Sequence, residues 1–262
     1  MKTLIAFLKK EYMELIRSGK LTILFFVFVL FGILNPAIAK ITPWLMESMA
    51  SSLEGSGLVV TEIKIDAMTS WTQYYKNIEM ALIIFVLLVS NTFTKEYQSG
   101  TLVLVLTKGL SRFKVVAAKT VVMMLLWTFC DWLCFGITYG YNAYYWDNSV
   151  AAHLFYAAFC YWLFGIWVMT LVVIFSSLAQ NNTSVLVGIG GTFLAFSLIG
   201  MFSSVKKYLP IKLMDGLSLL SAEATKKDFD AAIVITIIFS IILIGCSIII
   251  FNRKLISSQR EA

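Results

Sequence analysis

The sequence is poor in charge: only 14% of its 262 residues are Asp, Glu, Lys or Arg, against about 25% in ordinary soluble proteins. It has one histidine and four cysteines. With no CxxC pair and no group of Cys and His, a metal site is not expected. The cysteines all lie in apolar runs and are expected to be small buried hydrophobic residues. They are Cys130, Cys134, Cys160 and Cys246.

Motifs for covalent chemistry are also missing. The sequence contains no GxxxxGK[ST] phosphate-binding loop, no nucleophile elbow and no HExxH pair, so it predicts neither nucleotide hydrolysis nor a membrane hydrolase. We therefore expect a chain that is not an enzyme by itself and binds no cofactor. The net charge of +6 does not predict nucleic-acid binding, because every Lys and Arg falls in an expected loop, terminus or helix end.

Apolar residues are abundant. They make up 59% of the chain, and the mean hydropathy is +0.83. A soluble fold of this size would expose much of that surface and aggregate, so the sequence predicts a single all-α integral membrane domain, residues 1–262. Because a helix needs about 20 apolar residues to cross a bilayer, we expect six transmembrane helices. They are Leu21–Ile41, Ile78–Phe93, Val115–Tyr141, Leu154–Ser177, Val185–Phe202 and Ala231–Phe251.

Two spans differ from the average length. The second is short and is expected to extend backward through WTQYYKNIE, with Trp71, Tyr74 and Tyr75 near the lipid headgroups. The third is long and ends in YGYNAYYW, a belt of aromatics of the kind found at membrane–water boundaries. With the N-terminus inside, 13 Lys and Arg residues lie on the inner side and 8 on the outer side. This excess predicts that both termini are cytoplasmic.

The N-terminal segment 1–20 predicts an interfacial helix. On a helical wheel, apolar residues occupy one arc and charged residues the rest. The apolar set is Leu4, Ile5, Leu8, Tyr12, Leu15 and Ile16. A secretory signal peptide is the rival interpretation, because an A-x-A pattern follows the first apolar run. The long, organised charged preface argues against it. Pro36 is expected to kink or end the first span.

The loops assigned to the outside are long. Residues 42–77 contain Gly55 and Gly57 between weakly amphipathic pieces. Residues 205–230 contain two apolar clusters and predict either a re-entrant or surface helix or a plain solvated loop. Glycines also indicate helix contacts: Gly136 and Gly140 are spaced as GxxxG, and the fifth span contains Gly188, Gly190 and Gly191. These are interpreted as positions of close helix packing.

The inner segment 94–114 differs from a bland loop. The stretch KEYQSGTLVLVLTKGLSRFK, residues 95–114, contains helix formers and an apolar centre rather than Gly, Ser and Pro filler. Gly100 offers a turn between two short helices, and Ser111 can cap the third span. Residues alone leave two interpretations open: an ordinary interfacial loop, or a helix–turn–helix elbow that docks on a soluble protein.

This segment resembles the cytoplasmic elbow of the type-2 class of ABC transporter permeases. The resemblance is carried by the order E-x-x-x-G-T, then S-R, then A-K: Glu96, Gly100 and Thr101, Ser111-Arg112 and Ala118-Lys119. The layout of an amphipathic N-terminal helix, six spans and a large first outer loop is also similar. The resemblance implies that the elbow is a coupling helix inserted into a separate ATPase subunit. It implies coupling roles for Lys95, Glu96, Tyr97, Gly100, Thr101, Leu102, Leu104 and Arg112.

Further expectations follow from the resemblance. Two permease chains, identical rather than different, would pair in a bacterial plasma membrane. Two ABC ATPases would dock beneath them and hold ATP and Mg. The complex would export an amphiphilic cargo, such as a drug, an antimicrobial peptide or a lipid-like molecule, by alternating access. The alternatives are a stand-alone secondary transporter or channel, and a permease that senses a peptide and signals through the ATPase without transport.

One acid is placed well inside a span. Asp131, flanked by Trp127 and Trp132, costs about 2.5–3.5 kcal/mol in a bilayer and should face the bundle interior or stay protonated. It is a candidate for a substrate or proton path together with the two tryptophans. The alternatives are a structural hydrogen bond, to Thr128 or to a neighbouring helix, and a shallower position in the membrane than assumed.

Overall fold

The computed structural model describes residues 2–53, 66–99, 111–179 and 181–258, and within them it contains helices and no strand. The long helices are α1 (Lys2–Arg17), α2 (Lys20–Leu53), α3 (Ala67–Val89), α6 (Arg112–Tyr145), α7 (Leu154–Leu178), α8 (Asn182–Ile199) and α11 (Lys227–Ser258). The short elements are α4 (Asn91–Gln98), α9 (Ser203–Lys206), α10 (Gly216–Leu220) and the 3-10 turns η1 (Asn148–Val150) and η2 (Pro210–Met214).

Six of these stretches are long and apolar enough to cross a membrane. They are Lys20–Leu45, Ala67–Glu96, Arg112–Tyr145, Leu154–Leu178, Asn182–Ile199 and Lys227–Phe251. The predicted all-α membrane fold with six spans is therefore confirmed. The second span reaches back to Ala67, as expected from its aromatic extension, and so includes Glu79 as well as the apolar run.

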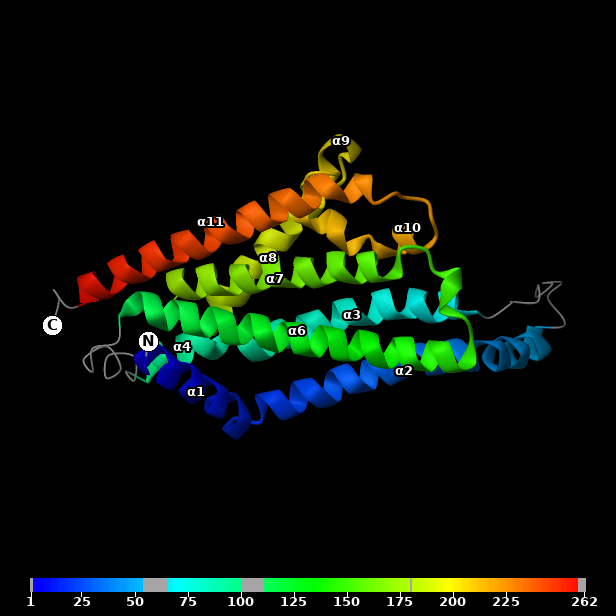
Figure 1. Cartoon of the computed structure of the whole chain (residues 1–262), viewed down its shortest axis with the longest axis horizontal. Helices are drawn as coiled ribbons and strands as arrows, with labels where there is room; N and C mark the ends of the chain where they lie inside the picture. The colour runs from blue at the N-terminus through cyan, green and yellow to red at the C-terminus, as the bar shows by residue number, and fades with distance from the viewer. Residues whose placement is uncertain (1, 54–65, 100–110, 180, 259–262) are drawn as a thin grey trace.

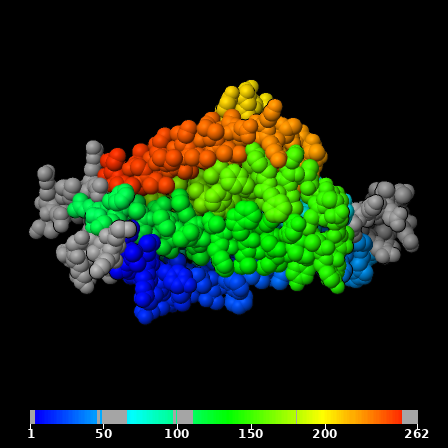
Figure 2. Space-filling view, in the orientation of Figure 1, coloured from blue at the N-terminus to red at the C-terminus, as the bar shows by residue number. Residues whose placement is uncertain are grey.

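The helices form an elongated bundle (Figure 1). The helices α1 and α4 and the last turns of α11 lie at one end, and η1, α10 and the end of α2 lie toward the other. Figure 2 shows α11 along one long edge and α1 with α2 along the opposite edge. Both ends of the described chain thus reach the same end of the bundle as α4, which fits an even number of spans.

The bundle is built around α7. In an apolar 18-residue stretch of α7, 72% of the residues are buried, against 11% in α8 and 17% in the corresponding stretch of α11. The aromatic rings of Phe28, Phe85, Trp127 and Tyr161 meet in its centre, with ring centroids 5.4 to 6.4 Å apart. A Cβ on Gly165 would lie 2.1 Å from the Trp127 ring, so α7 has a glycine where the indole packs. In contrast, α8 and α11 present most of their apolar side chains outward.

The cysteines follow this division of the helices. Cys130, Cys134 and Cys160 are buried, as predicted from their apolar surroundings. Cys246 is exposed, so the prediction was wrong for this residue. It lies on α11, whose outward face is apolar, and an apolar run on such a helix does not distinguish residues that face the bundle from residues that face lipid.

The first span does not end at Pro36. Helix α2 continues through Pro36 and Pro43 to Leu53, although proline removes the backbone N–H that would bond to the carbonyl four residues earlier. The carbonyl left by Pro36 belongs to Gly32, and the Thr138 hydroxyl donates to it at 3.1 Å. A neighbouring helix therefore supplies the missing donor, as membrane proteins require.

The predicted outer loops contain more helix than expected. Because α2 runs to Leu53 and α3 begins at Ala67, helices occupy both ends of segment 42–77, and Gly55 and Gly57 lie outside the described residues. In segment 205–230, of the two alternatives the structure shows short helices. The side chains of Pro210, Leu213, Leu219 and Leu220 are buried, so this segment packs on the bundle rather than lying free in solvent.

The packing glycines divide into two groups. A Cβ on Gly188 would lie 2.4 Å from the Phe175 ring, and one on Gly32 would lie 2.9 Å from Ile137. These two glycines permit close contacts within the chain. A Cβ on Gly136, Gly140, Gly190 or Gly191 would meet no described atom within 4 Å. The expected GxxxG contact is therefore not made between the described residues of this chain.

Candidate functional site: the coupling elbow and the membrane interior

The N-terminal helix α1 forms one side of the candidate site. Phe7, Glu11 and Leu15 recur at four-residue spacing and are buried against the bundle, as one face of a helix should be. Ile5 and Tyr12, from the predicted apolar arc, are exposed instead. Helix α1 therefore has a buried face against the bundle and an exposed strip that includes apolar residues.

Helix α4 forms the beginning of the predicted elbow. It follows α3 after a break at Ser90, whose backbone N–H still bonds to the Val86 carbonyl. Phe93, Thr94 and Glu96 are buried, whereas Lys95 is exposed. The alternation places one charged residue of the pair Lys95-Glu96 outside the bundle and the other inside it.

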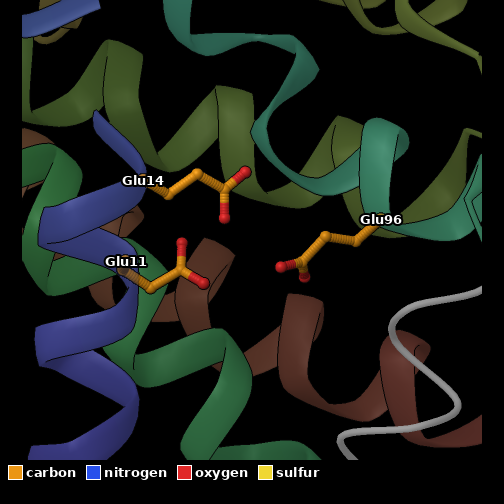
Figure 3. Close-up of side chains that lie close together, drawn as sticks. All are labelled: Glu11, Glu14 and Glu96. Atoms are coloured by element: carbon orange, nitrogen blue, oxygen red, sulfur yellow. The ribbon is translucent and has the colours of Figure 1, made fainter. Parts of the chain in front are cut away.

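Glu96 belongs to a cluster of five charged side chains from three helices, and Figure 3 shows its three carboxylates. Its Oε1 accepts a hydrogen bond from Lys10 of α1, and its Oε2 lies 3.1 Å from Lys119 Nζ of α6. Lys119 Nζ also donates to Glu11 Oε2 at 2.9 Å. Lys10 Nζ lies 2.9 Å from Glu14 Oε2 and 3.0 Å from Glu11 Oε1. The two ammonium groups thus join α1, α4 and α6.

Lys119 is the most deeply buried member of this five-residue cluster, with 1% of its surface exposed. A buried ammonium needs both charge partners and hydrogen-bond acceptors. In addition to Glu11 and Glu96, it donates to the Thr92 carbonyl at 3.2 Å. The Phe93 ring centroid lies 5.5 Å from its Nζ, which adds a cation–π contact. Together these contacts fix the position of the Lys119 ammonium group.

The cluster shifts the titration of its two more exposed members. Partial burial disfavours the charged form of Lys10, but hydrogen bonds to Glu96 and Glu14 outweigh it and raise the pKa of Lys10 well above its usual value. Partial burial likewise opposes ionisation of Glu14, yet the hydrogen bond and charge of Lys10 lower the pKa of Glu14. Both residues are therefore charged over the physiological pH range.

Three carboxylates of the cluster point toward a common space. One oxygen from each of Glu11, Glu14 and Glu96 lies within 4.8 Å of the others, a spacing that a metal ion could use. The ammonium groups of Lys10 and Lys119 already lie between these carboxylates. With two ammonium groups and three carboxylates, the cluster carries one excess negative charge. We therefore describe it as an ion-pair network.

The structure describes only part of the predicted coupling set. Lys95 and Glu96 lie on α4, Tyr97 is in α4 by its backbone, and Arg112 begins α6 and is half-buried. The remaining members lie outside the described residues: Gly100, Thr101, Leu102 and Leu104. Ser111 is the N-cap residue of α6, but its side chain makes no capping hydrogen bond to the described start of that helix.

The predicted substrate-path residues are not gathered at one cavity. Asp131 is 2% exposed and Trp127 is fully buried, whereas Trp132 is 37% exposed on the outside of the bundle. Trp127 Nε1 donates to the Trp162 carbonyl. The expected hydrogen bond between Asp131 and Thr128 is absent in the described chain, because the Thr128 hydroxyl donates to the Met124 carbonyl and Asp131 Oδ1 has no partner.

Sequence reasoning missed the groups that surround Asp131. The hydroxyls of Tyr74, Tyr75 and Tyr161 are buried without a hydrogen-bond partner in the described part of the chain. All three lie within electrostatic range of the Asp131 carboxylate. The only available signal was the YY pair shortly before Glu79, which composition alone assigns to the headgroup level. Asp131 thus faces the bundle interior, one of its expected alternatives.

A cavity of about 390 Å³ opens between α3, α7 and α8, within the range of small-molecule sites. Its lining is apolar and aromatic apart from a few polar atoms, and Glu79 stands at its wall. Glu79 lies near the middle of the span Ala67–Glu96. The expectation that Asp131 is the one acid well inside a span is therefore incomplete.

The comparison with protein families agrees with this architecture. The sequence profile described as ABC-2 family transporter protein matches residues 5–255. No curated protein gives a significant match to the chain. The matched segment includes most of α1, all six spans and the cluster at α4, so it covers both candidate sites. The chain therefore belongs to the ABC-2 transporter family, as a multi-pass permease subunit whose family implies an ABC ATPase partner.

Proposed function

We propose that this chain is the transmembrane subunit of an ATP-driven exporter of amphiphilic cargo. Two copies pair in a bacterial plasma membrane with both termini in the cytoplasm, and two ABC ATPase subunits dock at the bundle end that contains α1 and α4. ATP and Mg bind the ATPases, and this chain binds neither. The excess of Lys and Arg at the proposed inner side and the family membership support this arrangement.

The Glu96 ion-pair network carries the proposal. Glu96 lies on α4, which forms the beginning of the elbow, and pairs with Lys10 of α1 and Lys119 of α6. Removing one partner of the buried Lys119–Glu96 pair costs about 3–5 kcal/mol, and this cost favours movement of the three helices as one unit. A displacement of the elbow by the docked ATPase is thus transmitted to α1 and α6 instead of bending α4 alone.

In this mechanism the chain performs no covalent chemistry. ATP binding closes the ATPase pair and moves the elbow. The junction of α1, α4 and α6 passes the displacement to α3 and α6, which form the spans on either side of the elbow. Two packings that differ by a few kcal/mol are enough for such a switch, because nucleotide in the partner biases one of them. Lys95 and the elbow residues through Leu104 are the proposed ATPase contacts.

The proposed cargo class and the proposed pairing of two permease copies are supported by the helices that face outward. The cavity between α3, α7 and α8 has walls that are nearly all apolar, which suits a molecule entering from the lipid. Only 11% of the residues of α8 are buried, so a second permease copy has an apolar surface on which to pack. The open glycines Gly136 and Gly140 on α6 offer another surface of this kind.

Transport into inside-out vesicles tests the proposed function. The chain and its ATPase are co-expressed, and uptake of a labelled amphiphilic cargo is measured with and without ATP. We expect ATP-dependent uptake that disappears when the partner ATPase carries a substitution that abolishes hydrolysis. ATP hydrolysis that responds to a peptide without any uptake would favour the signalling alternative, and uptake driven by an ion gradient without ATP would favour a secondary transporter.

A further inference from the structure

Glu79 has an unusual environment for a carboxylate within a span. It lies near the middle of the second span, Ala67–Glu96, far from both ends of that helix. Its side chain is exposed at the surface of the chain and makes no ion pair with any described residue. A charge at this depth is costly, and such residues mark substrate or ion paths or pair with another charge.

The cavity beside Glu79 supplies the rest of a binding site. Its aromatic walls include Tyr161, Phe164, Trp167 and Phe193. The Tyr161 hydroxyl and the Trp167 indole N–H are both buried without a hydrogen-bond partner in the described part of the chain. Both atoms lie beneath the cavity surface, so an occupant would contact the aromatic rings of these two residues rather than their polar atoms.

The charge and the ring faces select the kind of occupant. Among the residues that the structure describes, Glu79 is the only charged one in the cavity lining, so an anion would meet repulsion and no compensating cation. The faces of aromatic rings attract cations, by about 0.5 to 2 kcal/mol for each well-placed ring. An apolar body fits the remaining walls, which come mainly from Leu, Val and Ile side chains.

We propose that the cavity between α3, α7 and α8 binds a hydrophobic monovalent cation, with Glu79 as its counter-charge. This inference rests on the proposed function and narrows its cargo class from amphiphiles in general to lipophilic cations. The apolar body packs on the aromatic walls, and the cationic centre lies near the Glu79 carboxylate. Binding supplies the charge partner that Glu79 lacks in the described chain.

Two ions of the same shape and opposite charge test the proposal directly. Equilibrium dialysis of the detergent-solubilised full-length chain measures binding of tetraphenylphosphonium and of tetraphenylborate. We expect the cation to bind and the anion to bind at least tenfold more weakly. Glu79→Gln should weaken the cation at least tenfold without weakening the anion. The matched control is Glu223→Gln, which removes an exposed carboxylate outside the cavity and should leave both affinities unchanged.

A second pair of variants tests the place of binding rather than the charge. Gly190 lines the cavity, and a Cβ there would meet no described atom within 4 Å. Gly190→Leu should therefore fill the cavity without unfolding the chain and weaken the cation at least tenfold. Gly245→Leu, also at an open position but on α11, should not. Unchanged cation binding in both Glu79→Gln and Gly190→Leu would overturn the proposal.

The dialysis experiment needs neither ATP nor the ATPase, so its outcome is separate from that of the transport assay. Glu79-dependent cation binding without ATP-driven uptake would support this site and refute the export function. Equal affinities for the two ions, unaffected by Glu79→Gln, would overturn the cation site even if another cargo is transported. In that case the cavity is a space for neutral lipid chains.

Discussion

Replacing Lys119 should cost more stability than replacing any other member of the Lys10–Glu96 network. Lys119→Met removes the cation that holds both Glu11 and Glu96, at 2.9 and 3.1 Å, and leaves these two buried carboxylates to the half-exposed Lys10 alone. Breaking a buried pair in this way costs about 3–5 kcal/mol. We expect the free energy of unfolding to fall by that amount.

Glu96→Gln should cost less. The amide oxygen can still accept a hydrogen bond from Lys10 or Lys119, and the substitution removes the one excess negative charge of the network. The expected loss is that of a hydrogen bond to a charged group, about 1.5–3 kcal/mol. In the double variant Lys119→Met/Glu96→Gln, Glu11 and Glu14 remain with Lys10. The stability lost in this double variant should therefore be smaller than the sum of the two single losses by about 1–3 kcal/mol.

Unfolding by sodium dodecyl sulfate in mixed micelles, followed by circular dichroism and tryptophan fluorescence, measures these differences. Lys9→Met is the matched control, because Lys9 is exposed on the same helix as Lys10 and its loss should change stability by less than about 0.5 kcal/mol. Additive losses in the double variant, or equal losses for Lys119→Met and Lys9→Met, would refute the movement of the three helices as one unit, on which the coupling mechanism depends.

Three further predictions concern coupling, pH and the first span. Glu96→Ala and Gly100→Pro should abolish the stimulation of ATP hydrolysis by cargo while leaving membrane insertion intact, and normal coupled turnover in both would contradict their assigned role. Because the pKa of Glu14 is lowered in the folded chain, its contribution is present above about pH 4.5 and is lost as pH falls through the folded pKa. The melting temperature in detergent should therefore drop below about pH 4.5, less steeply in Glu14→Gln than in Glu223→Gln, and identical acid limbs would count against the network. Thr138→Val should lower the free energy of unfolding by about 1–3 kcal/mol because the Gly32 carbonyl and Asn35 lose a buried partner. Adding Pro36→Ala should recover part of that loss by restoring the backbone N–H. An equal loss with and without Pro36→Ala would show that the carbonyl is not the cause.

Hydropathy predicted the spans because a bilayer imposes one length and one composition on every helix that crosses it. The rule that a proline ends a helix did not hold at Pro36. It is a local rule about one helix, whereas the donor that replaces the missing N–H comes from Thr138, on another helix far along the chain. Gly165 gave no signal for the same reason, since the Trp127 ring that requires it also lies on another helix.

The candidate sites were predictable to different degrees. The motif contains Glu96 and Lys119, but it does not predict their ion pairs with Lys10 and Glu11 of α1. These pairs join residues 86 and 108 positions apart, which no local pattern reveals. Glu79 was missed because the second span was drawn from its apolar run, so an acid next to Ile78 was placed at the edge. Only the extension of the span back to Ala67 places it near the middle.

The central claim is that the elbow, which begins in α4, contacts an ABC ATPase at the bundle end that contains α1. Photocrosslinking in intact cells tests this most directly, with p-benzoylphenylalanine in place of Lys95, which is exposed on α4. Lys207, which is exposed beyond α8, is the control on the proposed outer side. We predict an adduct with the ATPase from position 95 and none from position 207. No adduct from position 95, or one of equal yield from position 207, would contradict the account.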